Sequence, residues 1–196
     1  MRPERSHRRR WLSLAQFGML GIVLMLSACL NRWDIPAGSY RPLPDGVKVT
    51  PVGTLLASGT VVKVNDADTL AVLGPDRNVY KIRLQGIDAP ENKQNYGQHC
   101  AAKLRRLATD QRVTVEAYKK DRYQRIVAKV SLGGQDLALA MIRQGCGWHY
   151  TAYASEQSAA DQQAYARAES EARRRKIGLW RAARPQAPWE YRQQYR

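Results

Sequence analysis

From residue 60 onward, apolar and polar positions alternate in short stretches that turn residues separate. The first three stretches are 60–64, 69–73 and 79–84, and each is rich in β-branched or aromatic residues. Alternation with a period of two is typical of half-buried strands, so these stretches predict an antiparallel meander. Two further stretches of the same kind, 112–118 and 126–130, predict a fourth and a fifth strand.

Helical periodicity separates and follows these strands. Apolar residues share one face of a predicted helix over 101–107, and a short helix over about 137–142 ends before Gly145. A last helix is expected over about 156–176, which is rich in Ala and Arg. This order of elements predicts an α+β, mostly β fold, a five-stranded OB-type barrel with three helices. A split α+β sandwich is the alternative.

The N-terminal part of the chain has a different pattern. Arginines crowd residues 1–10, and the run over 11–31 carries no charge, which together are typical of an export signal. The run contains Leu26-Ser27-Ala28-Cys29, which resembles the lipobox of bacterial lipoproteins and implies cleavage before Cys29 and lipidation of its thiol. An uncleaved transmembrane anchor is the alternative. In both cases the following residues are exported.

Four parts of the chain are therefore expected. They are a signal peptide over 1–28, a Pro- and Gly-rich tether over 29–54, a folded domain over 55–182 and a basic aromatic tail over 183–196. The lipoprotein resemblance implies anchoring to a membrane of the cell envelope. Leu30, where Asp is absent, favours the periplasmic side of the outer membrane in a bacterium with two membranes.

The charge of the chain points to a polyanionic partner. Lys and Arg number 32 against 17 Asp and Glu, a net charge of +15. Without residues 1–28, which hold five Arg and one Glu, the remainder still carries 27 − 16 = +11. Such an excess indicates nucleic acid or an anionic membrane surface as the partner, and it argues against a small neutral substrate.

Carboxylates gather where the predicted second strand begins and the third ends. These two places are adjacent in a meander, so Asp68 and Asp88 are expected to face one another. Two close carboxylates repel unless a cation lies between them, and a hard divalent cation suits oxygen ligands. Pro90 favours an extended Ala89, whose carbonyl could be a third ligand, and Glu91 follows within reach of a metal-bound water. Asp residues that merely form turns are the alternative.

Two arginines add phosphate chemistry to this acidic group. Arg83 lies on the third predicted strand, and Arg125 begins the fifth. A cation with two guanidinium groups is what in-line attack on a phosphodiester requires, because both stabilise charge on the phosphoryl oxygens. Taken singly, each arginine could instead be a solvated charge or half of an ion pair.

Three motifs combine these residues: Asn65-Asp66-Ala67-Asp68-Thr69, Arg83-Leu84-Gln85-Gly86-Ile87-Asp88-Ala89-Pro90-Glu91 and Asp121-Arg122-Tyr123-Gln124-Arg125. Together they resemble the motifs of the staphylococcal-nuclease-like (thermonuclease) family, and the resemblance extends from about 58 to 182. It implies an OB-type barrel that cleaves DNA and RNA with Ca²⁺ and leaves 3′-phosphates, with single-stranded or unpaired regions favoured.

The resemblance also implies a role for each matching position. Asp68 and Asp88 would bind Ca²⁺ through their carboxylates, and Ala89 would bind it through its carbonyl. Glu91 would act as general base or orient the attacking water. Arg83 and Arg125 would contact the phosphate, and Tyr123 would line the nucleotide pocket.

Two positions depart from the family pattern. Gln124 replaces the usual glycine, and Ala89 replaces the usual threonine. The complete acid–arginine set nevertheless favours an enzyme. A lipid-anchored OB module that binds nucleic acid without cleaving it is the alternative.

The remaining cysteines leave two possibilities open. If Cys29 is lipidated, Cys100 and Cys146 remain, and export places them where disulfides persist. A bridge across the 46-residue separation (146 − 100) and two buried free thiols are both compatible with the sequence. A Cα separation well beyond ~7 Å would exclude the bridge.

Overall fold

The structure, a computed structural model, describes residues 54–195 and their side chains from residue 58. The predicted signal peptide, the lipobox with Cys29 and nearly all of the predicted tether lie outside the described residues. None of the helices in the described part is both long and apolar enough to cross a membrane.

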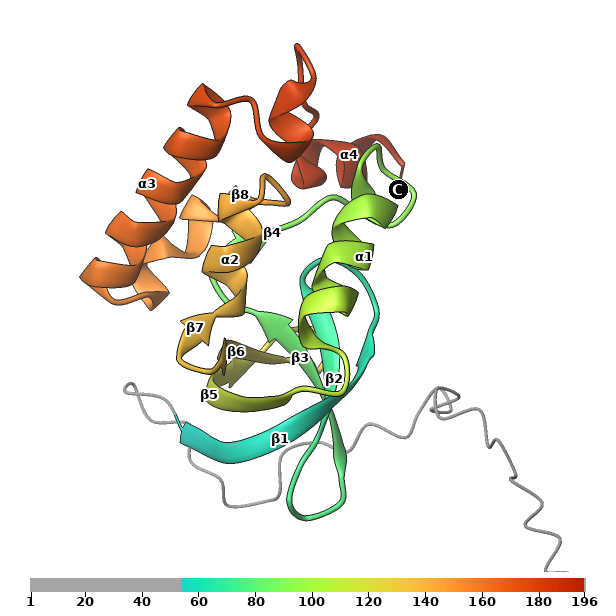
Figure 1. The fold of residues 1–196 in the computed structure, drawn as a ribbon, viewed down its shortest axis with the longest axis vertical. Coiled ribbons are helices and arrows are strands. Elements are labelled where there is room, and N and C mark those ends of the chain that lie inside the picture. The colour runs from blue at the N-terminus through green and yellow to red at the C-terminus, as the bar shows by residue number, and fades with distance from the viewer. Residues whose placement is uncertain (1–53, 196) are drawn as a thin grey trace, which may run out of the picture. The chain divides into compact units, whose positions relative to one another are not determined.

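A closed five-stranded barrel forms the centre of the fold, which confirms the predicted fold class (Figure 1). Neighbouring strands follow the order β3-β2-β1-β5-β6 and pair antiparallel. The parallel pairing of β3 with β6, in which Ile82 lies opposite Ile126, closes the barrel. The barrel strands are β1 (Thr54–Val64), β2 (Thr69–Leu73), β3 (Val79–Leu84), β5 (Arg112–Lys120) and β6 (Ile126–Leu132).

Alternating burial explains why these segments form barrel strands. In β3 and β6 every second side chain points into the core, as the sequence pattern predicts. The inward side chains include Val61, Leu70, Ile82, Val115 and Val130, all nearly inaccessible to solvent. Register shifts in β1 and β5 bend these long strands around the core.

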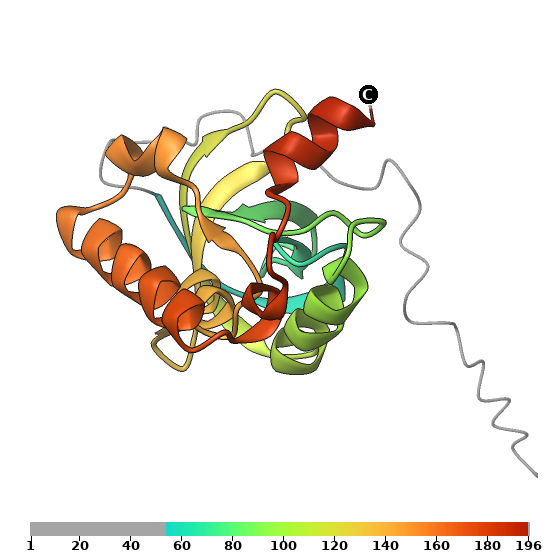
Figure 2. The ribbon, with the colours of Figure 1, turned by 90° about the horizontal axis from the view of Figure 1, so that it is seen from above.

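The three predicted helices lie next to one another over one side of the barrel, with the second between the other two (Figures 1 and 2). The predicted helices are present as α1 (Gly97–Ala108), α2 (Leu137–Arg143) and α3 (Ala159–Arg174). A 3₁₀ helix, Thr151–Glu156, precedes α3, which begins at Ala159 because the Ser158 hydroxyl accepts a hydrogen bond from the Asp161 amide.

A fourth α-helix follows where the sequence predicts only a tail. This helix, α4 (Pro188–Gln194), has Pro at its first position, and the Glu190 carboxylate accepts a hydrogen bond from the Ala187 amide. Trp189 packs against Trp148 and stacks on Tyr150. Its only large apolar residues, Trp189 and Tyr191, are two positions apart, which is not a helical spacing, so the helix was not predicted.

Short elements complete the fold at the end of β3. The two-residue strands β4 (Ile87–Asp88) and β8 (Trp148–His149) pair with each other, and β7 (Gln135–Asp136) extends the sheet beside β6. A second 3₁₀ helix spans Gly178–Arg181. The β4–β8 pairing fixes the backbone at Asp88, one of the predicted metal ligands.

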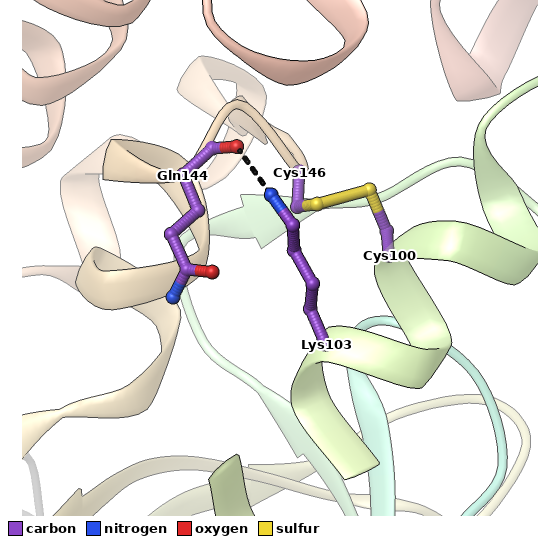
Figure 3. Close-up of a disulfide and its surroundings, with 4 residues drawn as sticks. All are labelled: Cys100, Lys103, Gln144 and Cys146. Carbon is purple, nitrogen blue, oxygen red and sulfur yellow. Dashed lines mark hydrogen bonds between the residues drawn. A yellow bond between two sulfur atoms is a disulfide. The ribbon is translucent and has the colours of Figure 1, made fainter. Parts of the chain in front are cut away.

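A disulfide joins α1 to the segment after α2 (Figure 3). Cys100 and Cys146 have Cα atoms 5.3 Å apart, and both side chains are fully buried. Beside the bridge, the Lys103 ammonium donates a hydrogen bond of 3.3 Å to the Gln144 carbonyl. Two contacts therefore hold α1 against this segment.

We expect replacement of both Cys100 and Cys146 by Ala to lower the free energy of unfolding by about 2–5 kcal/mol, because the bridge restricts a long loop in the unfolded chain. Urea denaturation of the wild type and the double variant measures the difference. The wild type in excess reductant is the matched control and should lose a similar amount. Equal midpoints for all three samples would show that the bridge adds nothing.

Candidate active site

A cavity of about 880 Å³ brings together all seven residues that the sequence assigns to catalysis and binding. Its walls come from the end of β3, the β5–β6 connection, the first 3₁₀ helix and α4. The predicted residues on these walls are Asp68, Arg83, Asp88, Ala89, Glu91, Tyr123 and Arg125.

The two predicted metal-binding carboxylates lie side by side. Thr69 pairs with Arg83 across β2 and β3, which places Asp68 beside the residues that follow β3. Asp68 Oδ2 accepts a hydrogen bond of 2.9 Å from the Ala89 amide. Asp68 Oδ2 and Asp88 Oδ1 each lie 3.1 Å from the same nitrogen, Nη2 of Arg83. The meander therefore creates the expected carboxylate pair.

Burial and mutual repulsion make this group of acids electrostatically strained. Burial raises the pKa of Asp88, a hydrogen bond from Arg192 opposes that rise, and the charge of Asp68 adds to it. Burial and then the charge of Asp68 raise the pKa of Asp66 to about 7. Acids in such surroundings gain from a nearby cation, because a positive charge favours their ionised forms.

The donor atoms at this position fit a hard divalent cation. Carboxylate oxygens are the preferred ligands of Ca²⁺, and the side chain of Asp88 is only 1% exposed. Within residues 54–195, no group of three His, Cys, Asp or Glu side chains is placed to hold a metal ion by itself. Two carboxylates would thus need neutral oxygens, such as the Ala89 carbonyl or water, to complete the ligand shell.

Arg83 braces the carboxylate pair. Its Nη1 donates hydrogen bonds to the carbonyls of Leu84 and Ile87, at 2.9 and 2.8 Å. Its Nη2 pairs with Asp68 and Asp88. Both terminal nitrogens therefore already have partners within the site, and Arg83 links the carboxylates to the backbone after β3.

Arg125 keeps one end of its guanidinium available. Its Nε donates to Asp121 Oδ2 at 2.7 Å, and its Nη1 donates to the Thr69 hydroxyl at 3.2 Å. That hydroxyl in turn donates to Asp68 Oδ1 at 3.1 Å. Among the described residues Nη2 of Arg125 has no hydrogen-bond partner. Arg125 is therefore better placed than Arg83 to bind a phosphate.

The turn before Arg125 keeps a glycine-like backbone although it contains Gln124. The φ angle of Gln124 is +61°, in the left-handed region. Asp121 Oδ1 accepts hydrogen bonds from the amides of Tyr123 and Arg125, at 2.9 and 3.0 Å. Burial raises the pKa of Asp121, but hydrogen bonds from Arg125 outweigh this effect and lower it. The departure from glycine therefore leaves the turn intact.

Tyr123 lies at the exposed rim of the cavity. Its side chain is 63% exposed, and the guanidinium groups of Arg122 and Arg125 lie 4.8 and 5.4 Å from its ring centre. An exposed aromatic ring between cations suits a nucleobase and its phosphate.

The loop between β4 and α1 fixes the backbone of Glu91. The Gln94 side chain accepts a hydrogen bond from the Glu91 backbone amide through Oε1. The Gln94 backbone amide donates to the Glu91 carbonyl at 2.8 Å. A Cβ atom on Gly97 would lie 1.8 Å from that carbonyl oxygen, so only glycine allows α1 to begin so close. The Glu91 side chain is 39% exposed and reaches the cavity.

Residues 81–182 match the family model described as staphylococcal nuclease homologue. The chain belongs to the staphylococcal nuclease family. An Escherichia coli relative, named as an uncharacterized endonuclease, is 36% identical over 154 residues, which are 78% of this chain and 96% of the relative. A micrococcal nuclease of Shigella flexneri is 36% identical over 143 residues, 68% of this chain and 79% of the relative.

A plant member of the staphylococcal nuclease family is much longer. The probable staphylococcal-like nuclease of rice (Oryza sativa subsp. japonica) is 40% identical over 117 residues, 60% of this chain and 34% of the relative. This chain thus spans about a third of that plant protein. The family match ends before α4, the helix that contributes a residue to the cavity.

Arg192 of α4 is the principal site residue that the sequence did not predict. Its Nη2 donates to Asp88 Oδ2 at 2.7 Å, and its Nη1 donates to Asp88 Oδ1 and Glu91 Oε1 at 3.2 and 2.8 Å. The hydrogen bond to Asp88 raises the pKa of the Arg192 guanidinium above its usual value. Arg192 lies 101 residues from Glu91 and outside every family motif, so the sequence held no signal for it.

Gln94 and Thr69 are two further site residues to which the sequence analysis assigned no role. Thr69 relays between Arg125 and Asp68, and it stood inside a recognised motif without an assigned role. Gln94 supports Glu91, and its Nε2 donates to the Gln186 carbonyl at 2.6 Å. A buried amide with partners on both sides links the Glu91 loop to the segment that precedes α4.

Proposed function

We propose that this member of the staphylococcal nuclease family is a Ca²⁺-dependent nuclease that hydrolyses phosphodiester bonds of DNA and RNA. The observation that carries the proposal is the meeting of Asp68, Asp88 and Glu91 with Arg83 and Arg125 on one cavity. The names of the bacterial relatives, an endonuclease and a micrococcal nuclease, support it.

In this proposal the acids divide into ligands and base. Asp68, Asp88 and the Ala89 carbonyl would hold Ca²⁺, which when bound polarises a phosphoryl oxygen. Glu91 accepts a proton from the attacking water, or orients that water, and its partly exposed carboxylate is accessible to solvent. The water oxygen forms a bond to phosphorus, the P–O5′ bond breaks, and the departing 5′ oxygen takes a proton from solvent, so the phosphate remains on the 3′ oxygen.

The arginines stabilise the negative charge that develops on the phosphoryl oxygens. Arg125 offers its unpartnered Nη2 to a phosphoryl oxygen, while Asp121 and Thr69 hold the rest of its guanidinium in place. A phosphate contact by Nη1 or Nη2 of Arg83 would have to replace one of the bonds that it makes within the site. Arg125 thus contributes chiefly by binding the substrate and Arg83 chiefly by bracing the carboxylates.

Unpaired nucleotides suit this site best. Tyr123 presents its ring at the rim of the cavity, where a base without a pairing partner can stack. The net charge of +11 outside the predicted signal peptide supports binding of the phosphate backbone of either DNA or RNA.

We also propose that the protein is exported and lipid-anchored through Cys29 to a membrane of the cell envelope, the outer membrane in a bacterium with two membranes. We expect Cys29→Ala to prevent lipidation and to change the mature size, because the thiol is the site of attachment. Labelling with a radioactive fatty acid and membrane fractionation measure both effects, and the Cys100→Ala/Cys146→Ala double variant, which keeps Cys29 and leaves no unpaired thiol in the domain, is the control. Identical label and size in wild type and Cys29→Ala would contradict the lipoprotein assignment.

Cleavage of plasmid DNA and of RNA tests the catalytic proposal. The full chain, purified in mild detergent, should cut both substrates with Ca²⁺ and lose activity in excess chelator. Retarded migration of the nucleic acid without cleavage would support the alternative of a binding module. Equal cleavage with and without chelator would contradict the metal requirement.

A further inference from the structure

We infer that Arg192 competes with the divalent cation for the carboxylates of Asp88 and Glu91, so that the C-terminal helix α4 sets the affinity of the site for metal. This inference rests on the proposed metal site. It concerns a residue outside the segment that matches the family model, residues 81–182.

The hydrogen bonds of Arg192 are the first argument. The guanidinium bonds both oxygens of Asp88 and also Oε1 of Glu91, at 2.7 to 3.2 Å. A cation bound to Asp88 needs a lone pair on one of those same oxygens, as does a cation-bound water held by Glu91. Two positive charges so close together also repel each other. The cation and this position of the guanidinium therefore exclude one another in part.

The anchoring of α4 is the second argument. Trp189, three residues before Arg192, stacks on Tyr150 at 6.0 Å between ring centres and contacts Trp148 edge-on. The Gln186 carbonyl accepts the hydrogen bond from Gln94, in the loop that carries Glu91. These contacts are independent of Arg192 and hold the helix beside that loop (Figure 1). Because α4 is anchored in this way, the Arg192 guanidinium has a high effective concentration at the carboxylates. It therefore competes with the cation at every cation concentration.

A comparison with Arg83 shows why Arg192 is the side chain that a bound cation would displace. Arg83 also contacts Asp68 and Asp88, but its Nη1 is fixed to two backbone carbonyls after β3. Within residues 54–195, every hydrogen bond of the Arg192 side chain goes to these two carboxylates, so the side chain can turn away without breaking a bond to the backbone. Its side chain is 37% exposed, so water can solvate it once released.

Calorimetric titration of the full chain with Ca²⁺ tests the inference without measuring activity. We expect Arg192→Gln to bind Ca²⁺ about 10- to 100-fold more tightly than wild type, because charge-assisted hydrogen bonds no longer have to be exchanged. Arg192→Lys should fall between the two, since an ammonium cannot hold both carboxylates in the same two-pronged way. Arg184→Gln removes an equal charge from an exposed position before α4 and should bind Ca²⁺ like wild type.

Thermal unfolding gives a second measurement on the same samples. Without Ca²⁺, Arg192→Gln should unfold at a lower temperature than wild type, because buried Asp88 loses a partner. Saturating Ca²⁺ should raise its midpoint by more than it raises that of wild type.

Three results separate this inference from the proposed function. Equal or weaker Ca²⁺ binding by Arg192→Gln, in a protein that still cleaves DNA, would overturn the inference alone. An unchanged affinity with a lower turnover would also overturn it and would make Arg192 a substrate contact. If neither wild type nor Arg192→Gln binds Ca²⁺, the metal site itself is wrong and the inference fails with it.

Discussion

Replacing Glu91 by Gln should reduce kcat on single-stranded DNA by about two to four orders of magnitude, the range expected when a general base is lost. The amide has the shape of the carboxylate and can still accept the hydrogen bond that Arg192 Nη1 gives to Oε1. The hydrogen bonds with Gln94 involve the backbone of Glu91 and are unaffected. The substitution thus removes the proton acceptor and little else.

Initial rates against substrate concentration, at saturating Ca²⁺, measure this effect. KM should change little, because Glu91 does not contact the phosphate in the proposed arrangement. Glu171→Gln, on the exposed side of α3 where Glu171 pairs with Arg174, is the matched control and should cut like wild type. A Glu91→Gln enzyme with wild-type kcat would mean that another group activates the water.

Local sequence patterns predicted the barrel and its main helices. The alternation in 79–84 and 126–130 appears as alternating burial in β3 and β6. One boundary differs from the periodicity: α1 begins at Gly97, four residues before the expected start at 101, and Gly97 fits closely against the Glu91 carbonyl there. Such a close approach between segments has no counterpart in the periodicity of a single segment.

The carboxylate pair could be predicted because strand order brings the start of β2 beside the end of β3. Asp68 directly precedes β2 and Asp88 follows β3 after a short turn, so the two acids lie close together. Arg192 could not be predicted in this way, because its position depends on how α4 packs on Tyr150 and Trp148. Motifs and strand order do not contain that packing.

The two predicted arginines have different surroundings, so their substitution should have different consequences. We expect Arg83→Lys to lower kcat/KM by about 10³-fold and also to lower the free energy of unfolding by about 2–4 kcal/mol. A lysine ammonium cannot reach two backbone carbonyls and two carboxylates at once, so Asp88, nearly inaccessible to solvent, would lose part of its compensation.

Arg125→Lys is the matched comparison, because Arg125 is more exposed, at 22% against 12% for Arg83, and bonds only side chains. It should impair cleavage as well, but cost at most about 1 kcal/mol of stability, as expected for a partly solvated ion pair. Urea denaturation and steady-state kinetics on the same preparations separate the two effects. Equal losses of stability in both variants would mean that Arg83 does not brace the carboxylates, and that both arginines serve the phosphate alone.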